Sequence, residues 1–131
     1  MIMESLAGKR ILVVEDEFLV AELLCARLAQ AGATLVAPTD RSSVALDYIA
    51  NEPLDGAVLD FMLADGTCLE VAQELGSRGV PFLIVSALPV SELPAELRNS
   101  PYLGKPIHPA VFIELATRTF NTPVAPPAAV A

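Results

Sequence analysis

The stretch ILVVEDEFLVAELL, residues 11–24, determines the fold of this chain. Its first four residues are apolar and suit a buried strand, and after the acids the apolar residues return at the spacing of an amphipathic helix. Three acids, Glu15, Asp16 and Glu17, stand between the two patterns. One carboxylate can cap the helix, so the other two need a different explanation.

Apolar segments of strand length recur along the chain, and most are continuous rather than alternating. This is typical of strands buried on both faces of a parallel sheet. The expected strands cover residues 10–15, 33–38, 55–60, 81–86 and 101–105, and helical patterns cover residues 17–31, 42–51, 67–78 and 108–120. Because strand and helix alternate, we expect an α/β fold with a doubly wound parallel sheet.

Residues 87–101 break this alternation. Pro89, Pro94 and Pro101 leave room for at most a short helix near residues 94–99. The fourth helix is therefore expected to be shortened or irregular. The end of the chain is rich in Pro and Ala, and we expect a flexible tail there. The expected organisation is an N-terminal extension over residues 1–8, one domain over residues 9–120 and a tail over residues 121–131.

Composition narrows the possible functions. A net charge of −8 argues against direct binding of nucleic acid, which needs a basic patch. The mean hydropathy is high, at +0.54, but no apolar run reaches the ~18 residues of a membrane span. The first ten residues make a poor secretory signal, so we expect a cytoplasmic protein without membrane insertion. Cys25 and Cys68 are far apart in sequence and are expected to be buried thiols.

The strand ends carry a set of polar residues. In an open α/β sheet, ligands bind outside the carboxyl ends of the strands. The residues expected there are Glu15, Asp16, Asp60, Ser86 and Lys105. Carboxylates within ~4 Å of one another repel by a few kcal/mol, so the cluster needs a cation. Carboxylate oxygens suit Mg²⁺, Lys105 can neutralise an anion, and a carboxylate can attack phosphorus to give an aspartyl phosphate.

Together these residues resemble the receiver domain of two-component response regulators. The resemblance rests on VVEDE at 13–17, VLD at 58–60, VSA at 85–87 and YLGKP at 102–106, and it covers about residues 9–120. It implies a flavodoxin-like sheet of five parallel strands in the order 2-1-3-4-5. It also implies a cytoplasmic signalling protein, not a conventional enzyme, that assists its own phosphorylation and dephosphorylation.

The resemblance assigns a role to each matching residue. Asp60 stands where the phosphoacceptor stands, and Ser86 and Lys105 match the hydroxyl and the lysine that contact the phosphoryl group. Asp16 is similar to the direct Mg²⁺ ligand, and Glu15 to the residue that holds the ion through water. The backbone carbonyl of Met62 would be a further metal ligand. Tyr102 matches the aromatic that turns inward with Ser86 in the switch, and Pro106 stands where a cis proline is usual.

Taken singly, each residue also has a structural explanation. Asp16 can cap a helix, Asp60 can belong to a turn, Ser86 can be a satisfied hydroxyl, Lys105 a solvated charge and Tyr102 a core residue. Five coincidences in order at five expected strand ends are much less probable than one site. The sequence therefore favours a phosphorylation site that uses Mg²⁺.

The segment PFLIVSAL at 81–88 indicates which subclass of receiver domains the chain resembles. It resembles the stand-alone receivers called FAT GUY proteins, whose fourth strand reads P-F-x-F-A-T-G-Y. Pro81, Phe82 and the hydroxyl of Ser86 agree with that motif, whereas Ile84 does not, and nor do Val85, Ala87 and Leu88. The chain is therefore expected to lie near this subclass.

The function predicted is a single-domain response regulator. It would accept a phosphoryl group on Asp60 from a histidine kinase or a histidine phosphotransfer protein, and signal to a downstream protein in a phosphorelay. The resemblance implies that the positions two residues beyond Asp60 and Ser86 tune dephosphorylation; here they are the apolar Met62 and Leu88, which cannot orient a water molecule, so a long-lived phosphoryl group is expected. Two alternatives stay open: a degenerate receiver that only binds a partner, and a phosphohydrolase of the haloacid dehalogenase type, although Met62 replaces the second Asp of that class.

Overall fold

The computed structural model describes residues 4–122, and a sheet of five parallel strands lies at its centre. The strands are β1 (Arg10–Val14), β2 (Thr34–Thr39), β3 (Gly56–Asp60), β6 (Phe82–Ser86) and β7 (Tyr102–Gly104), in the order β2-β1-β3-β6-β7. Counted along the chain within this sheet, that is the expected order 2-1-3-4-5. The prediction of a doubly wound α/β fold is confirmed.

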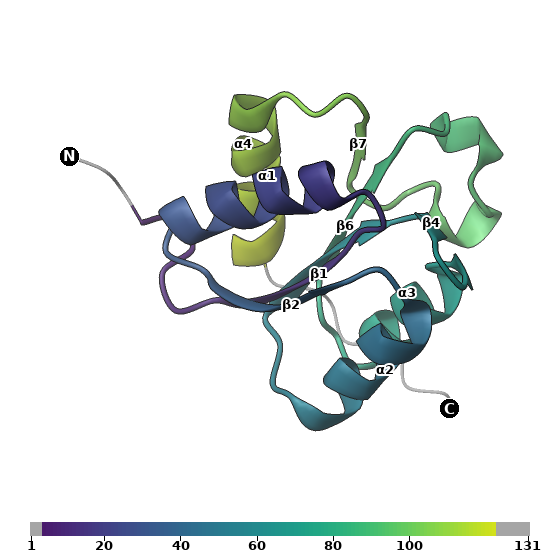
Figure 1. The fold of residues 1–131 in the computed structure, drawn as a ribbon, viewed down its shortest axis with the longest axis horizontal. Helices are drawn as coiled ribbons and strands as arrows, with labels where there is room; N and C mark the ends of the chain where they lie inside the picture. Colours follow the sequence, from purple (N-terminus) through teal and green to yellow (C-terminus); the bar gives the residue numbers. More distant parts are fainter. Residues whose placement is uncertain (1–3, 123–131) are drawn as a thin grey trace.

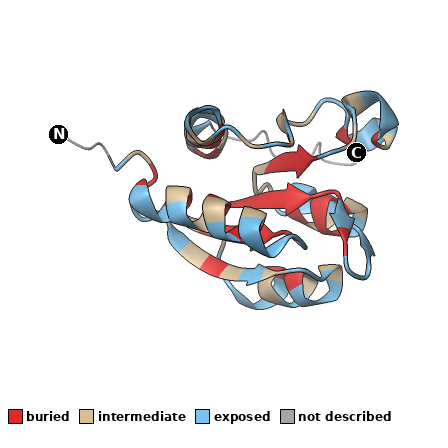
Figure 2. Cartoon of the chain, turned by 45° about the horizontal axis from the view of Figure 1, so that its top comes forward, coloured by how far each residue is buried: buried red, intermediate tan, exposed pale blue. Residues whose placement is uncertain are grey.

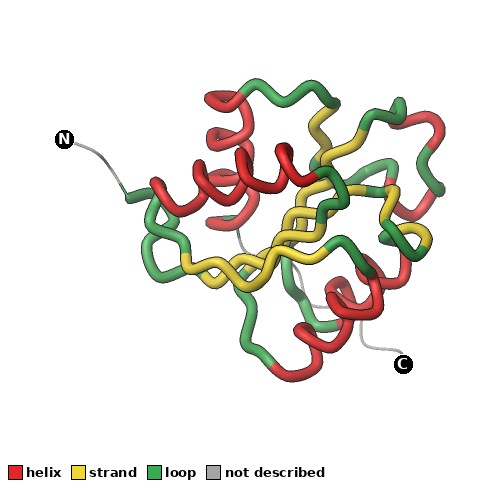
Figure 3. Tube along the Cα trace, viewed as in Figure 1, coloured by secondary structure: helices red, strands yellow, loops and turns green. Residues whose placement is uncertain are grey.

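Helices cover both faces of the sheet (Figures 1 and 3). They are α1 (Phe18–Gln30), α2 (Ser42–Asn51), α3 (Leu69–Ser77) and α4 (Pro109–Asn121). Helices α1 and α4 contact each other on one face, and α2 and α3 contact each other on the opposite face. The expected boundaries hold to within two residues. None of the helices in residues 4–122 is long and apolar enough to cross a membrane.

The sheet separates two hydrophobic cores, because alternate residues of each buried strand point to opposite faces. On β1, Leu12 belongs to the core beneath α2 and α3, and Val13 to the core beneath α1 and α4. Figure 2 shows the central strands as buried and the outer helix surfaces as exposed. Burying a side chain of this size contributes roughly 1.5–3 kcal/mol, so the strands are held firmly and their ends have well-defined positions.

A short hairpin follows β3 and was not predicted from the sequence. Strands β4 (Met62–Leu63) and β5 (Gly66–Thr67) pair antiparallel. Asp65, in the turn between them, accepts hydrogen bonds from the backbone N–H groups of Ser42 and Ser43 at 2.7 and 3.1 Å. These bonds lower the pKa of Asp65 to about 2. These hydrogen bonds therefore hold the hairpin, which follows β3, against the start of α2.

The segment between β6 and β7 replaces the fourth helix of the expected fold. It contains only two 3₁₀ turns, η1 (Val90–Glu92) and η2 (Ala95–Leu97), and Figure 1 shows it in green at the right of the view. Leu93 and Leu97 are buried in the α2–α3 core, and Arg98 Nε donates to the carbonyl of Leu93 at 2.9 Å. The prediction of a shortened, irregular fourth helix is confirmed, and two buried leucines anchor the segment.

The start of the described chain packs on the domain. Leu6, in the expected N-terminal extension, is fully buried in the α1–α4 core, and its N–H donates to the carbonyl of Ala31 at 2.8 Å. Residues 123–131, most of the expected tail, lie outside the described residues.

Candidate functional site

Three parallel strands bring the acidic residues together. Val14 of β1 pairs with Leu59 of β3, so Glu15 and Asp60, the residues that follow, lie next to each other at the carboxyl edge of the sheet. On the other side of β3, Asp60 pairs with Val85 of β6. One oxygen each of Glu15, Asp16, Glu17 and Asp60 lies within 4.8 Å of the others. The expected convergence of Glu15, Asp16 and Asp60 is thus present in the structure.

Lys105 lies in the middle of this cluster. It follows β7, and its N–H donates to the carbonyl of Ser86 at 2.9 Å, which holds the backbone against the end of β6. Its Nζ lies 2.8 Å from Glu15 Oε1, 2.6 Å from Glu17 Oε1 and 2.9 Å from Asp60 Oδ2. Burial lowers the pKa of Lys105, but these three contacts outweigh burial and raise it above its usual value. Lys105 is therefore a firmly charged ammonium.

Glu15 and Asp60 respond oppositely to their surroundings. Burial and the neighbouring Asp60 raise the pKa of Glu15 to about 8. For Asp60, burial also acts to raise the pKa, but contacts with Glu15, Lys105 and Asp16 outweigh it and lower the pKa. Two carboxyl groups this close share a proton more readily than they both ionise. Glu15 therefore holds a proton more readily than Asp60, which is the more easily ionised of the two carboxyl groups.

The donor set fits a hard divalent cation. Glu15 Oε1 is buried and has no hydrogen-bond partner within residues 4–122. Its contact with Lys105 is an ion pair. Burial and the neighbouring Asp60 raise the pKa of Asp16, which is consistent with an excess of negative charge. Clustered carboxylate oxygens of this kind are the ligands that Mg²⁺ prefers. Glu15, Asp16 and Asp60 can therefore hold Mg²⁺.

The remaining expected residues lie around this cluster. Ser86 ends β6 and is buried, and its Oγ accepts a hydrogen bond from the Leu88 N–H at 3.1 Å. Met62 is half exposed on the hairpin, and its N–H donates to Asp60 Oδ1 at 3.3 Å. The peptide bond between Lys105 and Pro106 is cis.

Tyr102 connects this edge to the irregular segment. Its hydroxyl donates to the carbonyl of Leu88, and it lies 3.3 Å from the carbonyl of Ser86. The aromatic side chain is half buried against the α2–α3 core. Tyr102 therefore holds the backbone on both sides of Ala87, directly after the strand that ends in Ser86.

Glu17 is the member of the cluster to which the sequence analysis assigns no role. It is the N-cap residue of α1, but its side chain makes no capping hydrogen bond and contacts Lys105 instead. A run of three acids was a signal that more than a cap is present. The direction of the third side chain depends on how α1 leaves the sheet, which the local sequence does not reveal.

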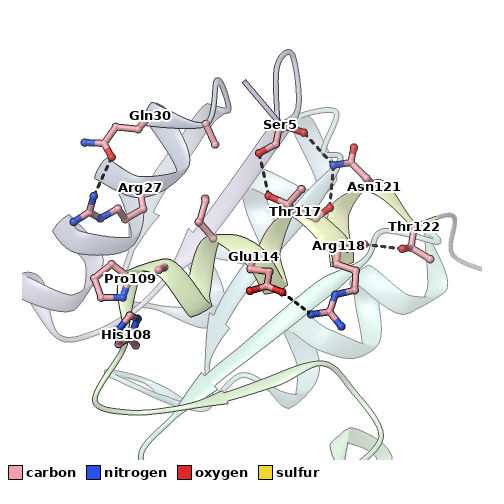
Figure 4. Close-up of a pocket in the computed structure, with 13 residues that line it drawn as sticks. Ser5, Arg27, Gln30, His108, Pro109, Glu114, Thr117, Arg118, Asn121 and Thr122 are labelled. Atoms are coloured by element: carbon pink, nitrogen blue, oxygen red, sulfur yellow. Dashed lines mark hydrogen bonds and ion pairs between the residues drawn. The ribbon is translucent and has the colours of Figure 1, made fainter. Parts of the chain in front are cut away.

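A large groove lies away from this cluster. It has a volume of about 1000 Å³ and runs between α1 and α4, as shown in Figure 4. Several of its polar side chains bind one another or nearby backbone: Arg27 donates to Gln30, Ser5 and Thr117 share a hydrogen bond of 3.0 Å, and Asn121 donates to the Ser5 carbonyl. It contains no cluster of carboxylates, so the chemistry is placed at the sheet edge.

The fold and this edge define a class of protein. A five-stranded parallel sheet in the order 2-1-3-4-5, with acids after β1 and β3 and a lysine after the last strand, is the architecture of a receiver domain. No protein-family model matches the chain, and no curated protein sequence matches it.

Solved structures do match it. SdrG from Sphingomonas melonis Fr1 is 31% identical, with a TM-score of 0.73, and the match covers 83% of this chain and 94% of SdrG. The unphosphorylated HemR receiver domain from Leptospira biflexa is 25% identical, with a TM-score of 0.76 over 90% of this chain and 98% of the other. The receiver domain of the sensor histidine kinase PA1611 from Pseudomonas aeruginosa PAO1 is 20% identical, with a TM-score of 0.72, 88% and 100% coverage, and a magnesium ion in its active site cleft.

This chain therefore belongs to the family of response regulator receiver domains. The domain is a signalling domain rather than a conventional enzyme.

Proposed function

We propose that this chain accepts a phosphoryl group on Asp60 and signals through protein contacts in a cytoplasmic phosphorelay. The observation that carries the proposal is the state of Asp60, a buried carboxylate with a lowered pKa at the carboxyl edge of the sheet. Lys105 Nζ lies 2.9 Å from its Oδ2, and Glu15 and Asp16 lie beside it. An ionised carboxylate next to a fixed cation is suited to attack an electrophilic phosphorus.

The donor in this proposal is a phosphohistidine of a histidine kinase or of a phosphotransfer protein. An oxygen of Asp60 forms a bond to phosphorus in line with the P–N bond, which breaks. The electron pair of that bond stays on the imidazole nitrogen, which takes up a proton. Lys105 neutralises the charge on the phosphoryl oxygens, which is the main form of catalysis in phosphoryl transfer.

Glu15, Asp16 and Asp60, with the backbone carbonyl of Met62, would hold Mg²⁺. When bound, the ion would supply positive charge to the phosphoryl oxygens and offset the repulsion among the carboxylates.

Signalling would follow from a change at the ends of β6 and β7. An aspartyl phosphate carries about −2 charge and strong acceptor oxygens, which would draw the hydroxyl of Ser86 towards them. That movement would break the Ser86 Oγ contact with the Leu88 N–H, 3.1 Å in this structure. Tyr102, whose hydroxyl binds the Leu88 carbonyl, would move with this backbone. The 87–101 segment is thus the proposed surface for the downstream partner.

The phosphodonor has to reach Asp60 over the exposed rim of the same edge. Phe18 and Leu19 at the start of α1 are 71% and 77% exposed, and Met62 on the hairpin is 51% exposed. Large exposed apolar side chains around a polar centre are characteristic of an interaction surface. They are the expected contacts of the donor protein.

Two finer points belong to the same proposal. Met62 and Leu88 cannot orient a water molecule for hydrolysis, so we expect the phosphoryl group to be long-lived. Pro81, Phe82 and Ser86, together with the irregular 87–101 segment, support a place near the FAT GUY subclass.

The test is phosphorylation by acetyl phosphate in the presence of Mg²⁺, read as the intact mass of the protein. We expect one added phosphoryl group in the wild type and in Asp47→Asn, an exposed aspartate on α2 that serves as the control. We expect none in Asp60→Asn and none when Mg²⁺ is chelated. An adduct that persists in Asp60→Asn would refute the assignment of Asp60. Absence of any adduct, also with beryllofluoride, would favour a degenerate receiver that acts only by binding.

A further inference from the structure

We propose that Glu17 competes with the phosphoryl group for Lys105 and so restrains phosphorylation of Asp60. This inference rests on the proposed function and adds a regulatory residue to it. The ion pair between Glu17 Oε1 and Lys105 Nζ, at 2.6 Å, is the shortest of the three that Lys105 makes. Glu17 therefore holds the cation on which the transferred group depends.

Lys105 already has three carboxyl partners: it donates hydrogen bonds to Glu17 and Asp60 and forms an ion pair with Glu15. An ammonium group has three N–H donors, and three carboxylates, from Glu15, Glu17 and Asp60, contact it. A phosphoryl group on Asp60 brings further acceptor oxygens and about −2 charge to the same place. For Lys105 to bind them, one of its present partners has to leave.

Glu17 is the partner that can leave. The side chains of Glu15 and Asp60 are 1% and 5% exposed, whereas that of Glu17 is 58% exposed. Its carboxylate can turn into water at little cost, whereas a buried carboxylate loses its hydration. The helix does not need the side chain in its present position, because Glu17 makes no side-chain capping bond.

Glu17 also lines a surface groove that reaches Lys105. A groove of about 560 Å³ beside the cluster is lined by Glu17, Ala87, Lys105 and Pro106, together with residues of α1. The Glu17 carboxylate adds negative charge to the acidic cluster, so it repels an anionic phosphodonor as well as occupying Lys105. A donor protein that contacts the start of α1 can displace Glu17, whereas a small anion has to overcome it unaided.

The experiment compares Glu17→Gln with Glu22→Gln. Each variant removes one negative charge, at the N-cap of α1 or in its second turn. Glu22 is exposed and, within residues 4–122, makes no ion pair or side-chain hydrogen bond. The probe is acetyl phosphate at saturating Mg²⁺, and the readout is the rate of phosphorylation by intact mass. Because the Glu17 carboxylate of this ion pair is exposed, we expect Glu17→Gln to be about 2- to 5-fold faster than wild type. Glu22→Gln should match the wild type.

Two further readouts separate competition from other roles. The advantage of Glu17→Gln should shrink at high salt, which screens exposed charges, and beryllofluoride should bind to Glu17→Gln more tightly by a similar factor. A slower Glu17→Gln whose Mg²⁺ affinity, measured by calorimetry, has fallen tenfold or more would overturn the inference and make Glu17 a metal ligand. Equal rates for all three proteins would overturn it too. Failure of all three to take up phosphoryl or beryllofluoride would refute the proposed function and, with it, the inference.

Discussion

Strand β1 has a cluster of charges at each of its ends, and the two clusters differ in burial. At its start, Arg10 Nη2 lies 2.9 Å from Glu52 Oε2, and the two side chains are 34% and 42% exposed. At its end, the side chains of Lys105 and Glu15 pair at 2.8 Å and are 10% and 1% exposed. The two ion-pair distances are nearly equal, but because the second pair is buried, its contribution to the free energy of folding differs from that of the first.

The first cluster is balanced and the second is not. Arg10 also donates through Nε to the carbonyl of Pro53, so its charge is well satisfied in contact with water. At the other end, four carboxyl groups accompany one lysine. Buried groups with strongly shifted pKa values are typical of functional sites, because stability alone does not favour them. The comparison teaches that burial and charge imbalance, rather than ion-pair distance, mark the functional end of the strand.

The largest difference in stability between the two ends of β1 should appear when the cationic side chain at each end, Lys105 or Arg10, is replaced. We expect Lys105→Met to lower the free energy of unfolding by about 3 kcal/mol in metal-free buffer at pH 8, because two buried carboxyl groups lose their cation. Arg10→Met should cost less than about 1 kcal/mol, since its ion pair is exposed. Urea unfolding followed by far-UV circular dichroism measures both. Similar losses in the two variants would show that the two ends are energetically alike.

Magnesium should stabilise only the carboxyl end. A cation that binds the folded protein raises the free energy of unfolding by about 2.7 kcal/mol at 100 times its dissociation constant. We expect Mg²⁺ to stabilise the wild type in this way at pH 8 and to have much less effect on Asp16→Asn. Glu52→Gln, at the other end of β1, is the control and should respond like the wild type. An undiminished response in Asp16→Asn would contradict the proposed metal site.

The pH dependence of the free energy of unfolding should also distinguish the two ends of β1. The pKa of Glu15 is raised from 4.5 to about 8 in the folded protein. Its protonated form therefore stabilises the fold fully below pH 4.5, and this contribution is lost as the pH rises through 8. In metal-free buffer we expect the free energy of unfolding to fall by about 2 kcal/mol between pH 6 and pH 8.

Glu15→Gln should flatten that slope, and Glu52→Gln should preserve it. Two other shifts at the site act mainly outside this window, because the pKa of Asp60 is lowered below 3.8 and that of Lys105 is raised above 10.5. The pKa of Asp16 is raised, so Asp16 adds to the slope in the same direction as Glu15. Chemical unfolding at a series of pH values is the measurement. A slope that survives in Glu15→Gln would place the titrating group elsewhere.

The smallest effect concerns the backbone beside the same end of β1. Arg10 pairs regularly with Thr34 of β2, but the register shifts between Leu12 and Val14, where Ala37 has a φ of 73°. A left-handed conformation costs an L-residue roughly 1–2 kcal/mol. Glycine avoids this cost, but it loses more chain entropy on folding, which offsets part of the gain. We expect Ala37→Gly to stabilise the protein by somewhat less than 1 kcal/mol. Ala33→Gly, just before β2, should destabilise it, and thermal unfolding of both variants tests the pair.

Much of the fold could be predicted because its signals are local. Continuous apolar runs located all five strands of the sheet, and helical spacing located α1 to α4 to within two residues. The prolines between β6 and β7 likewise predicted that no regular helix would form there. The hairpin after Asp60 was missed, since Met62–Leu63 and Gly66–Thr67 are too short to give a periodic pattern, and they depend on Asp65 binding the start of α2.

The candidate site could also be predicted only in part. The residue types and their places after the strands were visible in the sequence, so the convergence of Glu15, Asp60 and Lys105 could be expected from the rule for parallel sheets. The role of Glu17 could not be expected, because an acid before a helix suits a cap equally well. Only the angle at which α1 leaves the sheet directs that side chain to Lys105.

The sequence by itself determined the order of the elements, the edge at which the polar residues meet and the kinds of chemistry they can perform. These follow from hydrophobic periodicity and from the parallel direction of the strands. The tertiary structure alone decided that the pKa of Glu15 is raised and that of Asp60 is lowered. It also decided that Lys105 is divided among three carboxylates. Charge interactions depend on distance and burial in space, and residues that lie 45 and 88 positions apart in the chain acquire both only on folding.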